Sequence, residues 1–90
     1  MVKVMKKNKK VVAFKAAKIK RSIMRAGRDA KIYPKEVRYI ANAISRPVIS
    51  AMRRRKVVST AAIRKAVLTK LDRSYKDVAA AWRKYDRRRK

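Results

Sequence analysis

Residues 34–56 read PKEVRYIANAISRPVISAMRRRK and carry the longest regular hydrophobic pattern in the chain. Apolar side chains recur there at intervals of three and four residues, at Val37, Ile40, Ala41, Ile44, Val48, Ala51 and Met52. This spacing predicts an amphipathic helix over residues 34–54, and Pro34 suits its first position. A proline inside a helix removes one hydrogen bond and clashes with the preceding turn, so Pro47 predicts a kink or break near residues 45–46.

A shorter helix is expected before this stretch, over residues 16–26. Gly27, the only glycine in the chain, follows it where a C-terminal cap is needed. The apolar face of this helix consists of Ala16, Ile19, Ile23 and Ala26.

Two further helices are expected after it. Ser59 or Thr60 caps the first of them, and Ser74 with Asp77 approximates a capping box for the second, which ends in the basic residues 87–90. The inward residues are Ile63, Ala66, Val67 and Leu71 in the first helix and Val78, Ala81, Trp82 and Tyr85 in the second.

The N-terminal residues 1–14 have the β-branched composition of strands. Two valine-containing segments flank a polar stretch at residues 6–10, which predicts a hairpin that turns at Asn8. Val57 and Val58 predict a brief third strand. The expected architecture is therefore a single α+β domain over residues 1–90, with a β-hairpin packed beside four helices.

The composition excludes several kinds of chemistry. The chain has 30 Lys and Arg, 5 Asp and Glu, no His and no Cys, for a formal charge of +25. Zinc and haem ligation, disulfides and nucleophiles based on thiolate or imidazole are excluded, and the isolated acids predict neither a metal site nor an enzyme. No apolar run reaches the roughly 20 residues of a membrane span, and no signal peptide is visible, so we expect a cytoplasmic protein without a membrane partner.

Such an excess of cations predicts a polyanionic partner, and nucleic acid rewards many Lys and Arg contacts by releasing counterions. We expect a nucleoid-associated or regulatory protein that binds DNA rather than RNA. Its sequence specificity should be weak, because few Asn or Gln are present to contact base edges. A ribosome-bound, RNA-binding role stays open, as does the oligomeric state. The expected contacts are Lys6, Lys7, Lys9, Lys10, Lys18, Arg21, Arg25, Arg53, Arg54 and Arg55.

Short motifs in a fixed order point to a known family. They occupy residues 4–9 with Phe14, then 18–19, 22–26 (Ser-Ile-x-x-Ala), 58–67 (Val-Ser-x-x-x-Ile-x-x-x-Val) and 78–87 (Val-Ala-x-x-Trp-x-x-Tyr-x-Arg). In this order and spacing the chain resembles the ATP-cone domain, a nucleotide-sensing module of ribonucleotide reductases and of bacterial repressors of their genes. Part of the chain also resembles the helix-strand-helix of archaeal-type histones, but the helix at 34–54 is too short for that fold.

The resemblance implies a second function, the regulatory sensing of ATP or dATP. Its triphosphate and base contacts would fall on Val4, Lys6, Lys7, Lys18, Thr60 and Arg64. The chain departs from the family pattern at Lys9, where the family has Gly, and at Lys15, where it has Asp or Asn. Both departures add positive charge and favour the nucleic-acid hypothesis over the nucleotide-sensing one.

Overall fold

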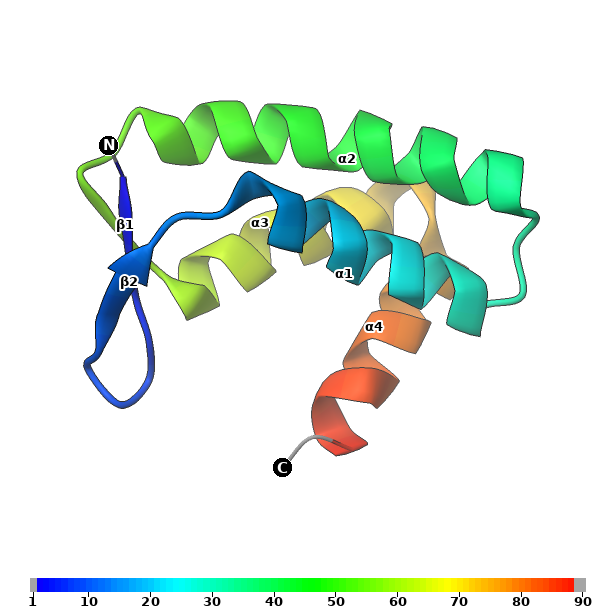
Figure 1. Ribbon diagram of the computed structural model, residues 1–90. Coiled ribbons are helices and arrows are strands. Elements are labelled where there is room, and N and C mark those ends of the chain that lie inside the picture. Colours follow the sequence, from blue (N-terminus) through cyan, green and yellow to red (C-terminus); the bar gives the residue numbers. More distant parts are fainter. Residues whose placement is uncertain (1, 89–90) are drawn as a thin grey trace.

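The computed structural model describes residues 2–88 and contains three strands and four helices (Figure 1). The elements are β1 (Lys3–Met5), β2 (Val11–Ala13), α1 (Ala16–Asp29), α2 (Pro34–Arg53), β3 (Val57–Ser59), α3 (Thr60–Ser74) and α4 (Lys76–Arg88). The predicted α+β class and the third strand are confirmed. The predicted basic terminus at Arg89 and Lys90 lies outside the described residues.

The sheet has the order β2-β1-β3, with β1 antiparallel to β2 and parallel to β3. One face of it covers the end of the helical layer, because Val2 and Val58 are buried there while Lys3, Met5 and Val57 on the other face are exposed. The sheet therefore joins the N-terminal hairpin to the start of α3, more than 50 residues later in the sequence.

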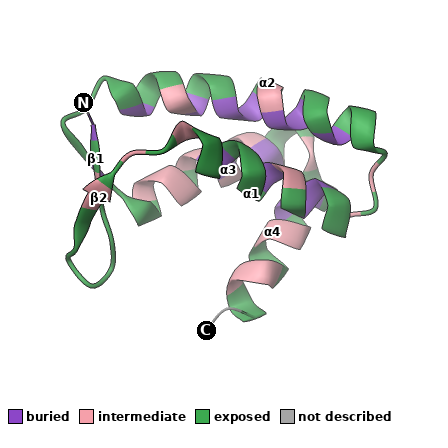
Figure 2. Cartoon of the chain, in the orientation of Figure 1, coloured by how far each residue is buried: buried purple, intermediate pink, exposed green. Residues whose placement is uncertain are grey.

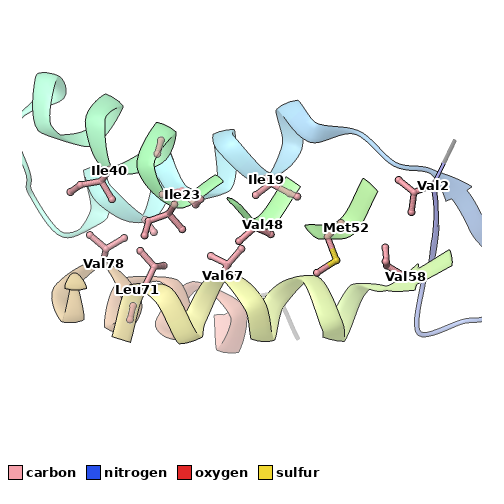
Figure 3. Close-up of a cluster of buried hydrophobic side chains, with 14 residues drawn as sticks. Val2, Ile19, Ile23, Ile40, Val48, Met52, Val58, Val67, Leu71 and Val78 are labelled. Carbon is pink, nitrogen blue, oxygen red and sulfur yellow. The ribbon is translucent and has the colours of Figure 1, made fainter. Parts of the chain in front are cut away.

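The core lies between the four helices (Figures 2 and 3). Each helix presents its predicted apolar stripe to it, and α1 packs against both α2 and α4. Ala51 is an exception, since it is exposed, and Ala79 is buried although it is not among the predicted inward residues. The labelled side chains in Figure 3 are Val2, Ile19, Ile23, Ile40, Val48, Met52, Val58, Val67, Leu71 and Val78.

The C-terminus of α1 differs from the prediction. Gly27 is buried inside the helix instead of capping it, and the left-handed residue after the helix is Lys31, with φ 61°. Ile32 N donates to Gly27 O at 3.2 Å and Lys31 N to Arg28 O at 2.9 Å, the pattern of a Schellman motif. A Cβ at Gly27 would lie 3.0 Å from Val37 Cγ2, so this glycine suits the close approach of α2 and a larger residue would displace the Val37 side chain.

Helix α2 continues through Pro47 without the predicted break. Ile44 and Val48, on either side of the proline, are both buried in the same core. Because both halves of the helix pack on one surface, tertiary packing offsets the hydrogen bond that Pro47 cannot donate.

Of the two predicted caps at the ends of α3, one is confirmed and the other is wrong. Ser59 caps its N-terminus as predicted, since the Ser59 Oγ accepts from Ala62 N at 3.0 Å. At the other end Ser74 is the last residue of α3, so the predicted Ser74–Asp77 capping box is wrong. Tyr75 alone separates α3 from α4, and its backbone forms hydrogen bonds with both helices. Tyr75 N donates to Leu71 O, and Tyr75 O accepts from Ala79 N.

Candidate functional site

The hairpin turn presents four lysines in five residues. Lys6 N donates to Lys10 O at 2.8 Å, Lys9 N to Lys6 O at 2.9 Å, and Lys10 N to the Asn8 Oδ1 at 3.1 Å. The turn was predicted at Asn8, but the left-handed residue is Lys9, with φ 66°, and Asn8 contributes its side-chain acceptor instead. All four lysines, Lys6, Lys7, Lys9 and Lys10, are exposed, so the predicted positive charges gather at the tip of the hairpin.

The start of α3 lies beside the root of this turn. The Thr60 hydroxyl donates to Met5 O at 3.4 Å, which joins residues 55 positions apart. The contact exists because β1 and β3 run parallel, so that the strand before the turn and the strand before α3 end at the same edge. Val4, half-buried in β1, completes this group, and the structure thus brings Val4, Lys6, Lys7 and Thr60 to one end of the sheet.

Arg64, one helical turn after Thr60, is held by an acid from the last helix. Its Nε lies 3.1 Å from the Asp86 Oδ2, and the same oxygen accepts from Trp82 Nε1 at 3.1 Å. Asp86 was not expected in the site. The sequence signal for this pairing is the four-residue spacing of Trp82 and Asp86, which brings their side chains together on one helix.

The second ion pair of the described residues also joins α3 to α4. The guanidinium of Arg83 donates two hydrogen bonds of 2.7 Å to Asp72. These bonds lower the pKa of the Asp72 carboxyl below its usual range and raise that of Arg83. Both ion pairs hold the two last helices together, while the other exposed cations of residues 2–88 have no acid within ion-pair distance.

Helix α1 carries three of the predicted cations, Lys18, Arg21 and Arg25, at spacings of three and four residues, and all three are exposed. Such spacing places them along one face of the helix. Arg25 stacks over the ring of Tyr85 at 4.2 Å from the ring centre, which joins this face to α4. Lys18 and Arg21 therefore lie on the side of α1 that leads towards α4.

Arg53, Arg54 and Arg55 lie at the opposite end of the sheet from the hairpin turn. They precede β3, whose first residue pairs with the first residue of β1, whereas the turn follows the last residue of β1. Arg53 and Arg54 line an open groove of about 500 Å³ between α2 and the start of α1. The predicted nucleic-acid contacts are thus divided among the hairpin turn, one face of α1 and the opposite end of the sheet.

This groove contains one further cation that the sequence prediction did not select, Arg46, together with Ile49, Ser50 and Ala16. Arg46 and Arg53 are seven residues apart, and this helical spacing could have identified Arg46 from the sequence, because it places both side chains on one face of α2.

Two kinds of site are absent from the described part of the chain. Residues 2–88 contain no cluster of three His, Cys, Asp or Glu side chains that could hold a metal ion. None of the helices in the same range is long and apolar enough to cross a bilayer.

The sequence matches the model of a known protein family. None of the curated proteins compared with the chain matches it. The family model of the ATP cone domain matches residues 2–90, in agreement with the motifs between Val4 and Arg87. Because this match spans nearly the whole sequence, the chain belongs to the ATP cone domain family.

Proposed function

We propose that this chain is a non-catalytic regulatory module that binds a nucleoside triphosphate, ATP or dATP, between the hairpin turn and the start of α3. The observation that carries the proposal is the Thr60–Met5 hydrogen bond, which holds the root of a lysine-rich turn against a helix N-terminus. Family membership supports the same function, and it favours this hypothesis over the nucleic-acid hypothesis that net charge alone suggests.

The chemistry of this end of the sheet suits a polyphosphate. Backbone N–H groups of the first turn of α3 and the positive end of its dipole favour an anion, and the bond from the Thr60 hydroxyl to Met5 O holds this helix end beside the turn. Lys6 and Lys7 supply point charges that can follow phosphate oxygens. Val4 offers the apolar contact that the resemblance assigns to the base.

Lys18 extends the proposed site along the sheet. Helix α1 begins at the end of the sheet opposite the turn, because β2 runs antiparallel to β1. Three-residue strands separate these ends by about 10 Å, a distance that an extended nucleoside triphosphate can cover. Lys15, where the family has an acid or amide, adds another cation near this path and favours a more highly charged ligand.

Isothermal titration with ATP, dATP, GTP and inorganic tripolyphosphate tests the proposal. We expect ATP or dATP to bind more tightly than tripolyphosphate, because only a nucleoside adds a base contact. The double substitution Lys6→Gln and Lys7→Gln should weaken ATP binding about tenfold. Its matched control is Lys20→Gln with Lys76→Gln, which removes the same charge from exposed lysines of α1 and α4. Equal losses in the two pairs, or equal affinity for tripolyphosphate, would contradict a nucleotide site at the hairpin.

We propose nucleic-acid binding as a second function, because one observation favours it independently. Only Arg64 and Arg83 form ion pairs within the described residues, although the chain carries a formal charge of +25. One bound triphosphate neutralises only a small part of this charge. A longer polyanion would neutralise more of it and relieve the repulsion between the exposed cations.

A further inference from the structure

The outward side of α2 forms a continuous polar crest. Its members recur at intervals of three and four residues, and we define the α2 crest as Lys35, Tyr39, Asn42, Arg46, Ser50 and Arg53. At 3.6 residues per turn these six positions fall within about 80° of one another around the helix axis. The crest is therefore a single stripe along nearly the whole helix.

This stripe lies on the side of α2 opposite the buried face. Tyr39 is 69% exposed, the four residues Lys35, Arg46, Ser50 and Arg53 are also exposed, and Asn42 is half-buried. Figure 2 shows the exposed side of α2 turned away from the other helices over its full length. Nothing in the described chain covers the crest, so a ligand can approach it along about 30 Å.

The charged residues of the crest itself are all cations. Glu36, the only acid in α2, lies about 80° from the centre of the crest, on the flank that also carries Arg54. Arg38 occupies one flank and Arg54 the other, and Arg54 lines the open groove with Arg46 and Arg53. The arrangement is thus a row of hydrogen-bonding side chains with a cation on each side.

We propose that the α2 crest is an interface for duplex DNA, with α2 lying in the major groove. This inference rests on the second proposed function and is independent of the triphosphate site. A major groove about 12 Å wide admits an α-helix, whereas the deep and narrow major groove of A-form RNA does not. Arg and Asn are the side chains best suited to purine edges, and Arg38 and Arg54 can reach the phosphates on the two sides of the groove.

The crest shares no residue with the nucleotide site, and Lys18 is the proposed nucleotide contact at the end of the sheet where Arg53 lies. Arg53 lies at the end of the sheet opposite the hairpin turn, so changes to the crest leave Lys6, Lys7 and Thr60 in place. Failure of one proposal can therefore be distinguished from failure of the other by measuring both ligands with the same variants.

The test is fluorescence anisotropy of a labelled 20-base-pair DNA duplex, with the same sequence as double-stranded RNA and as single-stranded DNA. Arg46→Gln with Arg53→Gln should weaken duplex DNA binding by about 30-fold or more and lower the slope of log affinity against log salt by about two. The matched control, Arg73→Gln with Arg87→Gln, removes two exposed arginines of α3 and α4 and should change affinity less than about threefold. Circular dichroism checks that both variants stay helical.

A third variant tests whether the crest touches more than phosphates. Asn42→Ala changes no charge, so it should weaken duplex DNA binding about fivefold while the salt slope stays the same. ATP affinity should be unchanged in Asn42→Ala, and it should fall no more in the Arg46 and Arg53 pair than in the Arg73 and Arg87 control pair.

Three results would overturn the proposal. One is an equal loss of DNA affinity in the crest and control pairs, which would indicate diffuse charge. Another is tighter binding to double-stranded RNA or single-stranded DNA than to the DNA duplex. The last is binding of anionic lipid vesicles by the wild-type protein without duplex DNA binding at 100 mM salt.

Discussion

Asp86 controls the availability of Arg64 in the proposed nucleotide site. The pairing of Arg64 Nε with the Asp86 carboxylate at 3.1 Å fixes the direction of the guanidinium and partly neutralises its charge. Asp86→Asn removes the charge that holds Arg64 and retains an amide oxygen that can accept from Trp82. We therefore expect this substitution to increase triphosphate affinity and to lower the stability of the folded protein.

The size of the expected stability change follows from how far the Arg64 and Asp86 side chains are exposed to solvent. The side chain of Arg64 is 41% exposed and that of Asp86 23%, so solvent screens the pair and limits it to about 0.5–1 kcal/mol. Weakening the Trp82 hydrogen bond adds about 0.5 kcal/mol. The free energy of unfolding should therefore fall by about 1 kcal/mol, while ATP binding becomes about two- to fivefold tighter because Asp86 no longer neutralises and orients the Arg64 guanidinium.

The assay is isothermal titration with ATP beside thermal denaturation of the free protein. Asp72→Asn is the matched control, because it removes one carboxylate from the other α3–α4 ion pair, that with Arg83, and changes net charge equally. If Asp86→Asn binds ATP no more tightly than Asp72→Asn, the gain comes from net charge alone. Unchanged affinity in Arg64→Gln would likewise refute a phosphate contact by Arg64.

The remaining predictions concern the turn, the α1–α2 contact and pH. Lys9→Gly should raise the free energy of unfolding by about 1 kcal/mol, because it relieves a lysine at φ 66°, and ATP affinity should be retained; denaturant titration and calorimetry measure both. Gly27→Ala should cost about 1 kcal/mol of stability because its Cβ meets Val37 at 3.0 Å, and a double-mutant cycle with Val37→Ala should show that the loss is smaller when Val37 is shortened. The bonds from Arg83 lower the pKa of Asp72 in the folded protein, so their stabilisation is present at neutral pH and disappears as the pH falls through that lowered value. The difference in denaturant midpoint between wild type and Asp72→Asn should therefore shrink with acidification.

Local patterns in the sequence were sufficient for most of the architecture. The apolar spacing of α2, the β-branched pair at residues 57–58 and the Ser59 cap are consequences of helical and strand geometry over a few neighbouring residues. The ordered motifs were likewise enough to indicate the family, since they record residue types at fixed spacing. Charge composition indicated a polyanionic ligand, but it favoured nucleic acid, whereas family membership favours a nucleotide.

Other features were decided by contacts between distant segments. Gly27 lies inside α1 because α2 approaches it there, and α2 passes Pro47 unbroken because both of its halves pack on one core. Neither result can be derived from local propensity, which ranks Gly and Pro as helix breakers wherever they occur.

The candidate site depends on tertiary structure in the same way. The sequence supplied Lys6, Lys7 and Thr60 as types of residue suited to phosphate, but only the parallel pairing of β1 with β3 places Thr60 against Met5. The Arg64–Asp86 pair likewise forms because α3 and α4 pack side by side. The α2 crest is visible in the sequence as a helical stripe. Its exposure was decided by the packing of α1 and α3 against the opposite face of α2, which leaves the crest in contact with solvent.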